Sequence, residues 1–445
     1  MTALSPKRRR DILDALRRGT VPLRGLDVLA VGLERFEAAL GEELEAVGEG
    51  GAHFKAVRGE YGSGKTFFAR WLTESAKARG FATAEIQISE GETPLHRLET
   101  VYRRVIENLE TAEAAPSAFR EIIDGWFHVL EADAIAAGTA ESDSAAVTAA
   151  TTDLMEKRLV AVTKTAPAFS AALRSYREAQ LSGNAAQADG LLAWLAGQPH
   201  VAASIRRTAG IRGELDHFGA LGFLQGLLAV LRDSDYRGLV LVLDEVETLQ
   251  RVRADVRERS LNALRQLVDE IDGGRFPGLY LVITGTPAFY DGTQGMQRLP
   301  PLAQRIGADF RGDPRFDNPR APQIRLLPFT TDSLNELGRR VRAIYASGSS
   351  AETRILAQAT DAYLNQLATS IAGQLGGRVG IAPRLYLRAL VDSLDRVEQF
   401  PDYRLDQGIL PELAVADLTE EERAASAMGR TFPQSIDDLD LQIGD

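Results

Sequence analysis

The chain has no cysteine among its 445 residues, which excludes disulfides and metal sites built from thiolates. Histidine is scarce as well, and its five positions are spread along the chain at 53, 96, 128, 200 and 217. This spread does not match the short ligand spacing of a zinc motif. A functional site in this chain must therefore be built from other side chains and from backbone groups.

Long apolar runs are also missing. No stretch reaches the about 18 apolar residues of a membrane-spanning helix, and the basic run at 7–10 is not followed by the apolar core of a signal peptide. We therefore expect a cytoplasmic protein that has no membrane partner. Its composition, 44% hydrophobic and 25% charged, is that of a globular chain with two or three domains.

The acidic charge is concentrated at one end. The net charge is −11, but residues 401–445 hold 11 acidic and 3 basic residues, which leaves −3 for the first 400 residues. We expect this acidic tail, with its scattered apolar residues, to be loosely held or to depend on a partner. The charge of the remaining chain neither requires nor excludes DNA as a partner.

Residues 59–66 read Gly-Glu-Tyr-Gly-Ser-Gly-Lys-Thr and fill every fixed position of the phosphate-binding (Walker A) pattern G-x-x-x-x-G-K-[ST]. A short strand is expected before this stretch and a helix after it. Glycines let backbone N–H groups approach phosphate oxygens, and a helix N-terminus adds a positive dipole end. We expect ATP to contact Gly59, Glu60, Tyr61, Gly62, Ser63, Gly64, Lys65, Thr66 and Phe67.

Two further positions complete the expected chemistry of this loop. The ammonium group of Lys65 would reach the β- and γ-phosphates, and the hydroxyl of Thr66 would be a ligand of Mg²⁺. Residues 239–243 form an apolar run that ends in Asp244 and Glu245, as a Walker B strand does. Asp244 would help to hold Mg²⁺, and Glu245 would act as the general base for the attacking water.

Other parts of the site are less specific. A third buried strand ends near Thr284 and Thr286, and either threonine could sense the γ-phosphate at the carboxyl edge of the sheet. Val21, Pro22 and Arg24 lie in a loop ahead of the first strand. They would either cover the nucleotide base or simply pack there.

The hydrophobic pattern predicts an α/β fold of the P-loop NTPase type, with a five-stranded, mainly parallel sheet. A nucleotide-binding domain would span 1–330 and contain a helical insertion at 110–215, an all-α lid domain would span 331–400, and the acidic tail would follow at 401–445. The first helix begins at Ser5 and Pro6, with the basic run 7–10 on its solvated face. The predicted strands lie at 53–57, 81–88, 239–244, 278–284 and 323–327.

Residues 20–400 resemble an AAA+ ATPase of the origin-recognition-like branch. The motifs that carry this resemblance follow one another as a phosphate loop, an Asp-Glu strand, a strand with a polar end, a loop arginine and a helical lid. The shorter motifs Leu-Arg-Arg-Gly-Thr-Val-Pro at 16–22, the loop at 59–66 and Ala-Pro-Arg at 382–384 look like the ATP-binding (BrxD-like) proteins of BREX-type phage-defence systems. The resemblance implies self-association or binding to other defence proteins. Origin-binding relatives often append a DNA reader after the lid, and we expect the 45 residues that follow the lid here to be too few and too acidic for such a module. Any contact with DNA would then come from the AAA+ body or from partners.

The same resemblance suggests roles for two arginines. Arg305, which follows the third buried strand, looks like the arginine finger that reaches the ATP of a neighbouring subunit, although it could be a surface residue. Arg384 looks like the lid sensor that contacts ATP in its own subunit. A guanidinium group suits both roles because it spreads positive charge over several donors.

We expect an Mg²⁺-dependent ATPase that acts as a switch in a BREX-type defence system. The alternatives are an ATP-dependent DNA-binding or loading factor, which resembles replication initiators, and a scaffold that binds nucleotide without hydrolysis. The carboxylate of Glu245 beside Asp244 argues against the scaffold, because a protein that binds nucleotide without hydrolysing it needs no catalytic base.

Overall fold

The computed structural model describes residues 4–114, 116–375, 380, 383–405, 418 and 422–423. These residues form two compact units that interleave in the sequence. Unit 1 is built from parts of 1–37, 59–71 and 325–445, and unit 2 from 38–58 and 72–324. Among the helices of the described ranges, none combines the length and apolar character needed to span a bilayer.

The fold is α/β, as predicted, but the sheet has six strands and the predicted number of five is wrong. The added strand is β3, which pairs antiparallel with β2 at one edge of the sheet. It has only two residues, too few to give an alternating pattern in the sequence. In spatial order the strands are β3 (Leu109–Glu110), β2 (Ala82–Gln87), β4 (Leu239–Asp244), β5 (Leu279–Gly285), β1 (His53–Arg58) and β6 (Gln323–Arg325).

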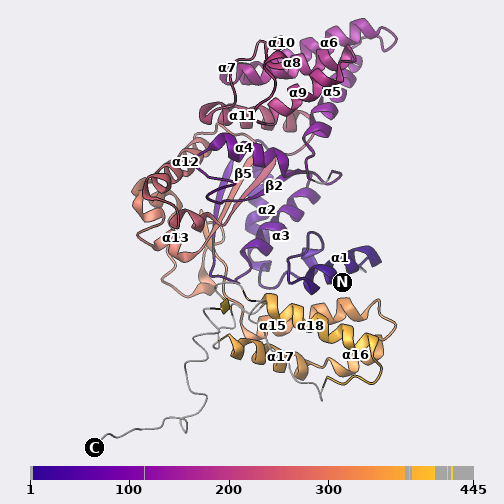
Figure 1. Cartoon of the computed structure of the whole chain (residues 1–445), viewed down its shortest axis with the longest axis vertical. Coiled ribbons are helices and arrows are strands. Elements are labelled where there is room, and N and C mark those ends of the chain that lie inside the picture. Colours follow the sequence, from indigo (N-terminus) through magenta and orange to yellow (C-terminus); the bar gives the residue numbers. More distant parts are fainter. Residues whose placement is uncertain are drawn as a thin grey trace, which may run out of the picture. The chain divides into compact units, whose positions relative to one another are not determined.

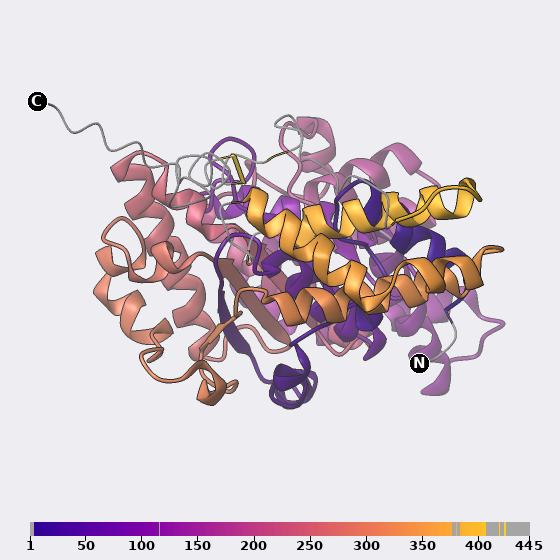
Figure 2. The same cartoon turned by 90° about the horizontal axis from the view of Figure 1, so that it is seen from below.

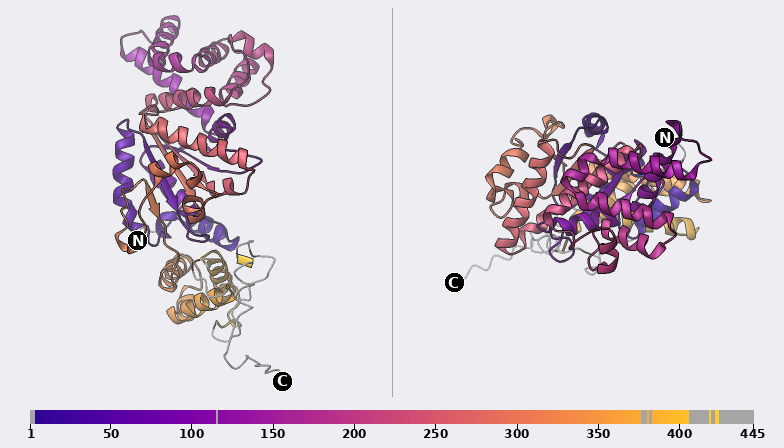
Figure 3. Two further views of the ribbon diagram at one scale, coloured as in Figure 1. Left: turned by 90° about the vertical axis from the view of Figure 1, so that its left-hand side faces the viewer. Right: turned by 90° about the horizontal axis from the view of Figure 1, so that it is seen from above.

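The four central strands run parallel, because β4 pairs with both β2 and β5, and β5 pairs with β1. Every residue of β4 and β5 is buried, as expected for parallel strands with helices on both faces of the sheet (Figure 3). The register places Gln87 beside Asp244 and Arg58 beside Gly285. The polar residues at these strand ends therefore share one edge of the sheet.

The helices of unit 2 enclose one continuous apolar core, which runs from the sheet into the helices of the predicted insertion. Helix α11 packs against α4, α5, α7 and α8, so it joins the sheet side to the insertion helices (Figure 1). The helices after β2 are α4 (Leu98–Glu107), α5 (Phe119–Ala136), α6 (Ser144–Arg158), α7 (Val160–Thr165), α8 (Pro167–Leu181), α9 (Ala185–Leu195), α10 (Ala203–Thr208), α11 (His217–Asp233), α12 (Ala254–Asp272), α13 (Pro287–Asp291) and α14 (Pro300–Ile306). Short 3₁₀ turns are η2 (Val246–Gln250), η3 (Met296–Arg298) and η4 (Pro314–Phe316).

Helices α2 (Glu34–Gly48) and α3 (Lys65–Ala78) each contribute to both units. The apolar core of unit 1 is formed by its other helices, among which α15 and α18 lie side by side (Figure 2). These are α1 (Pro6–Arg17), α15 (Thr331–Ala346), α16 (Glu352–Gln358), α17 (Asp361–Gln374) and α18 (Pro383–Gln399), with the 3₁₀ turn η1 (Leu26–Val28). Ser5 caps α1 as predicted, since its side chain accepts a hydrogen bond from the Arg8 backbone.

The basic run at the start of α1 is not a uniformly solvated face, which corrects the prediction. Lys7 and Arg10 are exposed, whereas Arg9 donates hydrogen bonds to the carbonyl oxygens of Tyr345 at 2.7 Å and Gly348 at 3.1 Å. Carbonyl groups at the end of α15 need donors once the helix stops, and this arginine supplies them. The contact fixes the first helix to the C-terminal helices.

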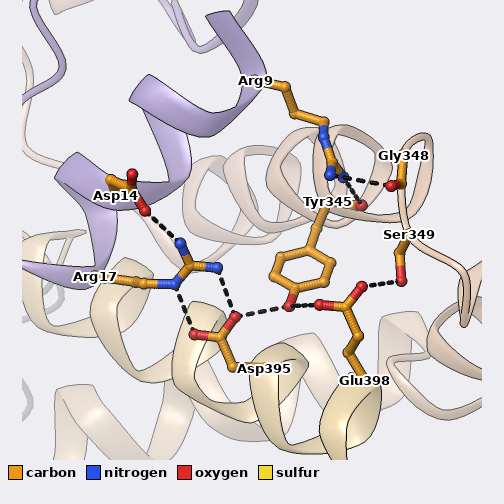
Figure 4. A network of polar contacts seen from close by, with 8 residues as sticks. All are labelled: Arg9, Asp14, Arg17, Tyr345, Gly348, Ser349, Asp395 and Glu398. Atoms are coloured by element: carbon orange, nitrogen blue, oxygen red, sulfur yellow. Dashed lines mark hydrogen bonds and ion pairs between the residues drawn. The ribbon is translucent and has the colours of Figure 1, made fainter. Parts of the chain in front are cut away.

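A polar network continues this contact inside unit 1 (Figure 4). Arg17 donates to both carboxylate oxygens of Asp395, at 2.8 and 2.7 Å. The hydroxyl of Tyr345 lies 2.7 Å from carboxylate oxygens of both Asp395 and Glu398. Burial and the two nearby carboxylates raise the pKa of Tyr345, so the hydroxyl keeps its proton.

In unit 2, a buried ion pair connects α2 to β1. The Lys55 ammonium group lies 2.6 Å from the Glu43 carboxylate, and it also donates to the carbonyl oxygens of Pro319 and Ala321. Tyr280 of β5 donates to the same carboxylate. Lys55 is only 1% exposed, and burial lowers its pKa. This cluster holds the segment that leads into β6 against β1.

We predict that Glu43→Ala lowers the free energy of unfolding by about 3–5 kcal/mol, because it leaves a buried ammonium group without a counter-charge. The control is Glu42→Ala. Glu42 is exposed and pairs with the exposed Arg320, so its loss should cost about 0–1 kcal/mol. Urea denaturation of both variants measures the difference. Equal changes in the free energy of unfolding would contradict the structural role of the buried pair.

Candidate nucleotide-binding site

The loop that follows β1 has the local geometry of a phosphate cradle. β1 ends at Arg58 and α3 begins at Lys65, so the chain passes from strand through loop to helix as predicted. Gly62 and Gly64 have φ angles of 77° and 89°, which favour glycine. A Cβ atom at Gly59 would lie 2.2 Å from Ser63 Oγ. The loop can adopt this path only because these positions lack side chains.

Lys65 is buried inside this loop. Its Nζ donates to the carbonyl oxygens of Gly59 at 3.1 Å and Glu60 at 3.4 Å, and it lies 5.1 Å from the centre of the Tyr61 ring. The Ser63 hydroxyl is buried and has no hydrogen-bond partner in the described part of the chain. A cation and an unsatisfied hydroxyl on a glycine loop at a helix start together fit a bound phosphate group.

Unit 1 also brings the predicted base-covering loop to the same helix. Arg70, on α3, donates to the carbonyl oxygen of Val21 at 2.8 Å, and Pro22 is buried next to it. Arg70 is five residues after Lys65, or about 7.5 Å along the helix. Helix α3 therefore follows directly on the phosphate loop and also holds the Val21 loop through Arg70. The sequence carried no signal for this role of Arg70.

Two apolar residues that follow β6 pack against the loop and were also missed. A Cβ at Gly59 would lie 3.3 Å from the Leu326 side chain, and one at Gly64 would lie 3.7 Å from the Phe329 ring. Phe329 and the predicted contact residue Phe67 both pack on the apolar core of unit 1. Thr66, the second residue of α3, is half-buried. These contacts carry no local sequence signal, because the residues lie far apart along the chain.

At the carboxyl edge of the sheet in unit 2, Asp244, Glu245 and Thr284 come together. The Thr284 hydroxyl donates to Asp244 Oδ1. The backbone N–H of Glu245 donates to Asp244 Oδ1 at 3.1 Å and lies 3.3 Å from Thr284 Oγ1. Thr284 is fully buried. The other candidate, Thr286, is instead the N-cap residue of α13.

Glu245 has an unusual backbone conformation, with a φ angle of 60° in the left-handed region. Non-glycine residues rarely adopt this conformation, and it costs of order 1–3 kcal/mol. The Glu245 carboxylate accepts a hydrogen bond from Gln87 Nε2 at 2.6 Å. Gln87 ends β2 beside Asp244, so the parallel register explains a partner that the sequence analysis missed.

The two proposed arginines both have acidic partners within the chain. Arg305, on α14, forms ion pairs of 2.7 and 2.9 Å with Asp269 and Asp272 of α12, and its side chain is 43% exposed. Arg384 lies in the first turn of α18 and pairs with Glu422 of the acidic tail. Ala382, the first residue of the motif at 382–384, lies outside the described residues.

The side chains proposed for Mg²⁺ are of the right chemical type. The Thr66 hydroxyl and the Asp244 carboxylate offer hard oxygen ligands. In the described ranges, no group of three or more His, Cys, Asp and Glu side chains is arranged to hold a metal. Mg²⁺ commonly needs only one or two carboxylates when phosphate oxygens complete its shell. Hydroxyl and carboxylate oxygens are therefore the chemical type of ligand that Mg²⁺ takes alongside phosphate oxygens.

Comparison with protein-family models gives a match over most of the chain. The family model described as "BREX system ATP-binding protein BrxC/D" matches residues 4–411. The matched range includes the phosphate loop, the strand ends with Asp244 and Thr284, and the helices α15 to α18. No curated protein and no solved structure gives a significant match.

Proposed function

The chain belongs to the family of BREX system ATP-binding proteins BrxC/D, and from this membership we propose that it is an Mg²⁺-dependent ATPase that acts as a switch in phage defence. The family confirms the predicted resemblance to BREX ATP-binding proteins. The placement in the origin-recognition-like branch of AAA+ ATPases stays a prediction. The observation that carries the proposal is the glycine loop around the buried Lys65 at the start of α3.

The phosphate loop supplies binding. Lys65 now donates to two loop carbonyl oxygens, and a phosphate group would give its ammonium a stronger, charged acceptor. The hydroxyls of Ser63 and Thr66 add neutral donors, and Thr66 would also be a ligand of Mg²⁺. Val21 and Pro22, held to α3 through Arg70, are the residues that we propose to cover the base.

The residues at the edge of the sheet supply hydrolysis. Asp244 would hold Mg²⁺, and Glu245 would accept a proton from the attacking water. Thr284 positions Asp244, and Gln87 fixes the direction of the Glu245 carboxylate. When bound, Mg²⁺ neutralises negative charge on the phosphate oxygens. The strained backbone at Glu245 supports a functional role, because such strain persists only where the surrounding structure imposes it.

A switch must transmit the nucleotide state to a partner. The partner could be a second copy of the chain or, in the alternative function, DNA. Self-association would let Arg305 reach the ATP of a neighbouring chain, after release from Asp269 and Asp272. The net charge of −3 over the first 400 residues is compatible with the alternative function, in which the ATP-bound chain acts on DNA. We also propose that this ATPase is located in the cytoplasm.

We predict that Lys65→Ala weakens ATP binding at least tenfold, because it removes the charge-assisted hydrogen bonds to the phosphates. Isothermal titration calorimetry with Mg·ATP measures the affinity. Lys77→Ala is the matched control, since this lysine lies on the same helix in its last turn and pairs with Glu110. Unchanged affinity in the Lys65 variant would refute the assignment of the loop.

Glu245→Gln should bind ATP like the wild-type chain but hydrolyse it about 10²–10⁴ times more slowly, because an amide cannot accept the proton of the attacking water. Phosphate release and calorimetry measure the two effects separately. Glu258→Gln, at an exposed position of α12, makes the same change in charge and should alter neither. Equal losses of binding and turnover would show that Glu245 has a different role.

Arg305→Ala should leave ATP affinity intact and lower hydrolysis, by about 10³–10⁵ if it acts as an arginine finger. Its action across subunits can be tested by mixing. The Arg305→Ala chain keeps an intact phosphate loop and the Lys65→Ala chain keeps an intact finger, so a mixture of the two should recover part of the activity.

The control for this mixing test is Arg311→Ala, which removes an exposed arginine that pairs with Asp309. That variant should hydrolyse ATP at the wild-type rate. The mixture could also stay inactive at concentrations where the wild-type chain associates and turns over ATP. Arg305 would then act within its own chain or not at all in catalysis.

A further inference from the structure

The contact between Arg384 and Glu422 joins the proposed sensor arginine to the acidic tail. Nε and Nη2 of Arg384 donate to the two carboxylate oxygens of Glu422, the first at 3.2 Å. The Glu422 side chain is only 5% exposed, and that of Arg384 is 33% exposed. A carboxylate is rarely buried to this extent without a charged partner. This tail residue therefore occupies a defined position on unit 1.

A second residue of the tail is seated on the same unit. Leu418 is 6% exposed and belongs to the apolar core that α1 and α15 to α18 form. Leu418 makes an apolar contact and Glu422 an ionic one, and both contacts are with unit 1. Leu418 and Glu422 are thus two tail residues that contact unit 1.

Arg384 also lies beside the loop that we propose to cover the base. A Cβ at Gly19 would lie 3.5 Å from Arg384 Nη1 and 3.6 Å from its Cγ. Two residues further along, the Val21 carbonyl is held by Arg70 on α3, the helix that begins at Lys65. Arg384 therefore binds Glu422 and lies close to Gly19, just ahead of the Val21 loop that α3 holds through Arg70.

We propose that Glu422 is an internal competitor of the nucleotide, and that the acidic tail lowers ATP affinity by occupying Arg384. The inference rests on the proposed ATP site. A carboxylate and a phosphate group use the same fork of guanidinium donors, so the edge of Arg384 that holds Glu422 is not available to a second anion. Release of the tail frees this edge and returns a buried carboxylate to water. A partner that binds the tail would thereby raise ATP affinity.

The test is a double-mutant cycle in the full chain, with affinity for the slowly hydrolysed probe Mg·ATPγS measured by calorimetry. Glu422→Gln should bind the probe about three- to tenfold more tightly, as expected if the tail occupies Arg384 for about 70–90% of the time. In an Arg384→Ala background, Glu422→Gln should have no further effect, because the residue for which the two anions compete is absent. Thermal unfolding of each variant checks that the chain is folded.

Asp402→Asn is the matched control, because it removes one negative charge from an exposed position just after α18. It should leave the affinity unchanged. Equal affinity of wild type and Glu422→Gln would overturn the inference, and weaker binding by Glu422→Gln would overturn it too, by showing that Glu422 orients Arg384 for the nucleotide. Failure of the ATP site itself is distinguishable, because the wild-type chain would then not bind the probe.

Discussion

Parallel pairing of β4 with β2 and β5 is the constraint on which the proposed hydrolytic residues depend. It brings the ends of three strands to one edge, and so places Gln87, Asp244 and Thr284 side by side although they are far apart in the sequence. Antiparallel pairing would send alternate strand ends to opposite edges. The hydrogen bonds among these residues and Glu245 are therefore a direct consequence of strand direction.

The sequence predicted the parts of this fold that depend on local pattern. The five longer strands, the phosphate loop and the cap at Ser5 all carry a signal within a few adjacent residues. Such a signal exists because burial on two faces requires an apolar run and a tight loop requires glycine. The two-residue strand β3 has no such signal, and its pairing with β2 appears only in the folded chain.

What the sequence could not predict was which side chains meet across long distances. Arg9 belongs to a basic run that resembles a solvated face, yet it satisfies carbonyl groups at the end of α15. Glu422 belongs to an acidic tail, and its carboxylate is buried against Arg384, a contact that no local pattern indicates. In both cases one partner from another part of the chain determines the environment of a charged residue. The composition of a segment does not show which residue that partner is.

The interleaving of the two units has a consequence for synthesis on the ribosome. Arg9 and Tyr345 are 336 residues apart, so at about 5–20 residues per second α1 waits roughly 17–67 s for the helices that cover it. During this time the apolar face of α1, with Ile12, Leu13 and Leu16, has no native partner from α15 to α18. Unit 2 is built from residues that end at 324. The residues of unit 2, which include those proposed for hydrolysis, are therefore all synthesised before unit 1, with the proposed phosphate loop, is complete.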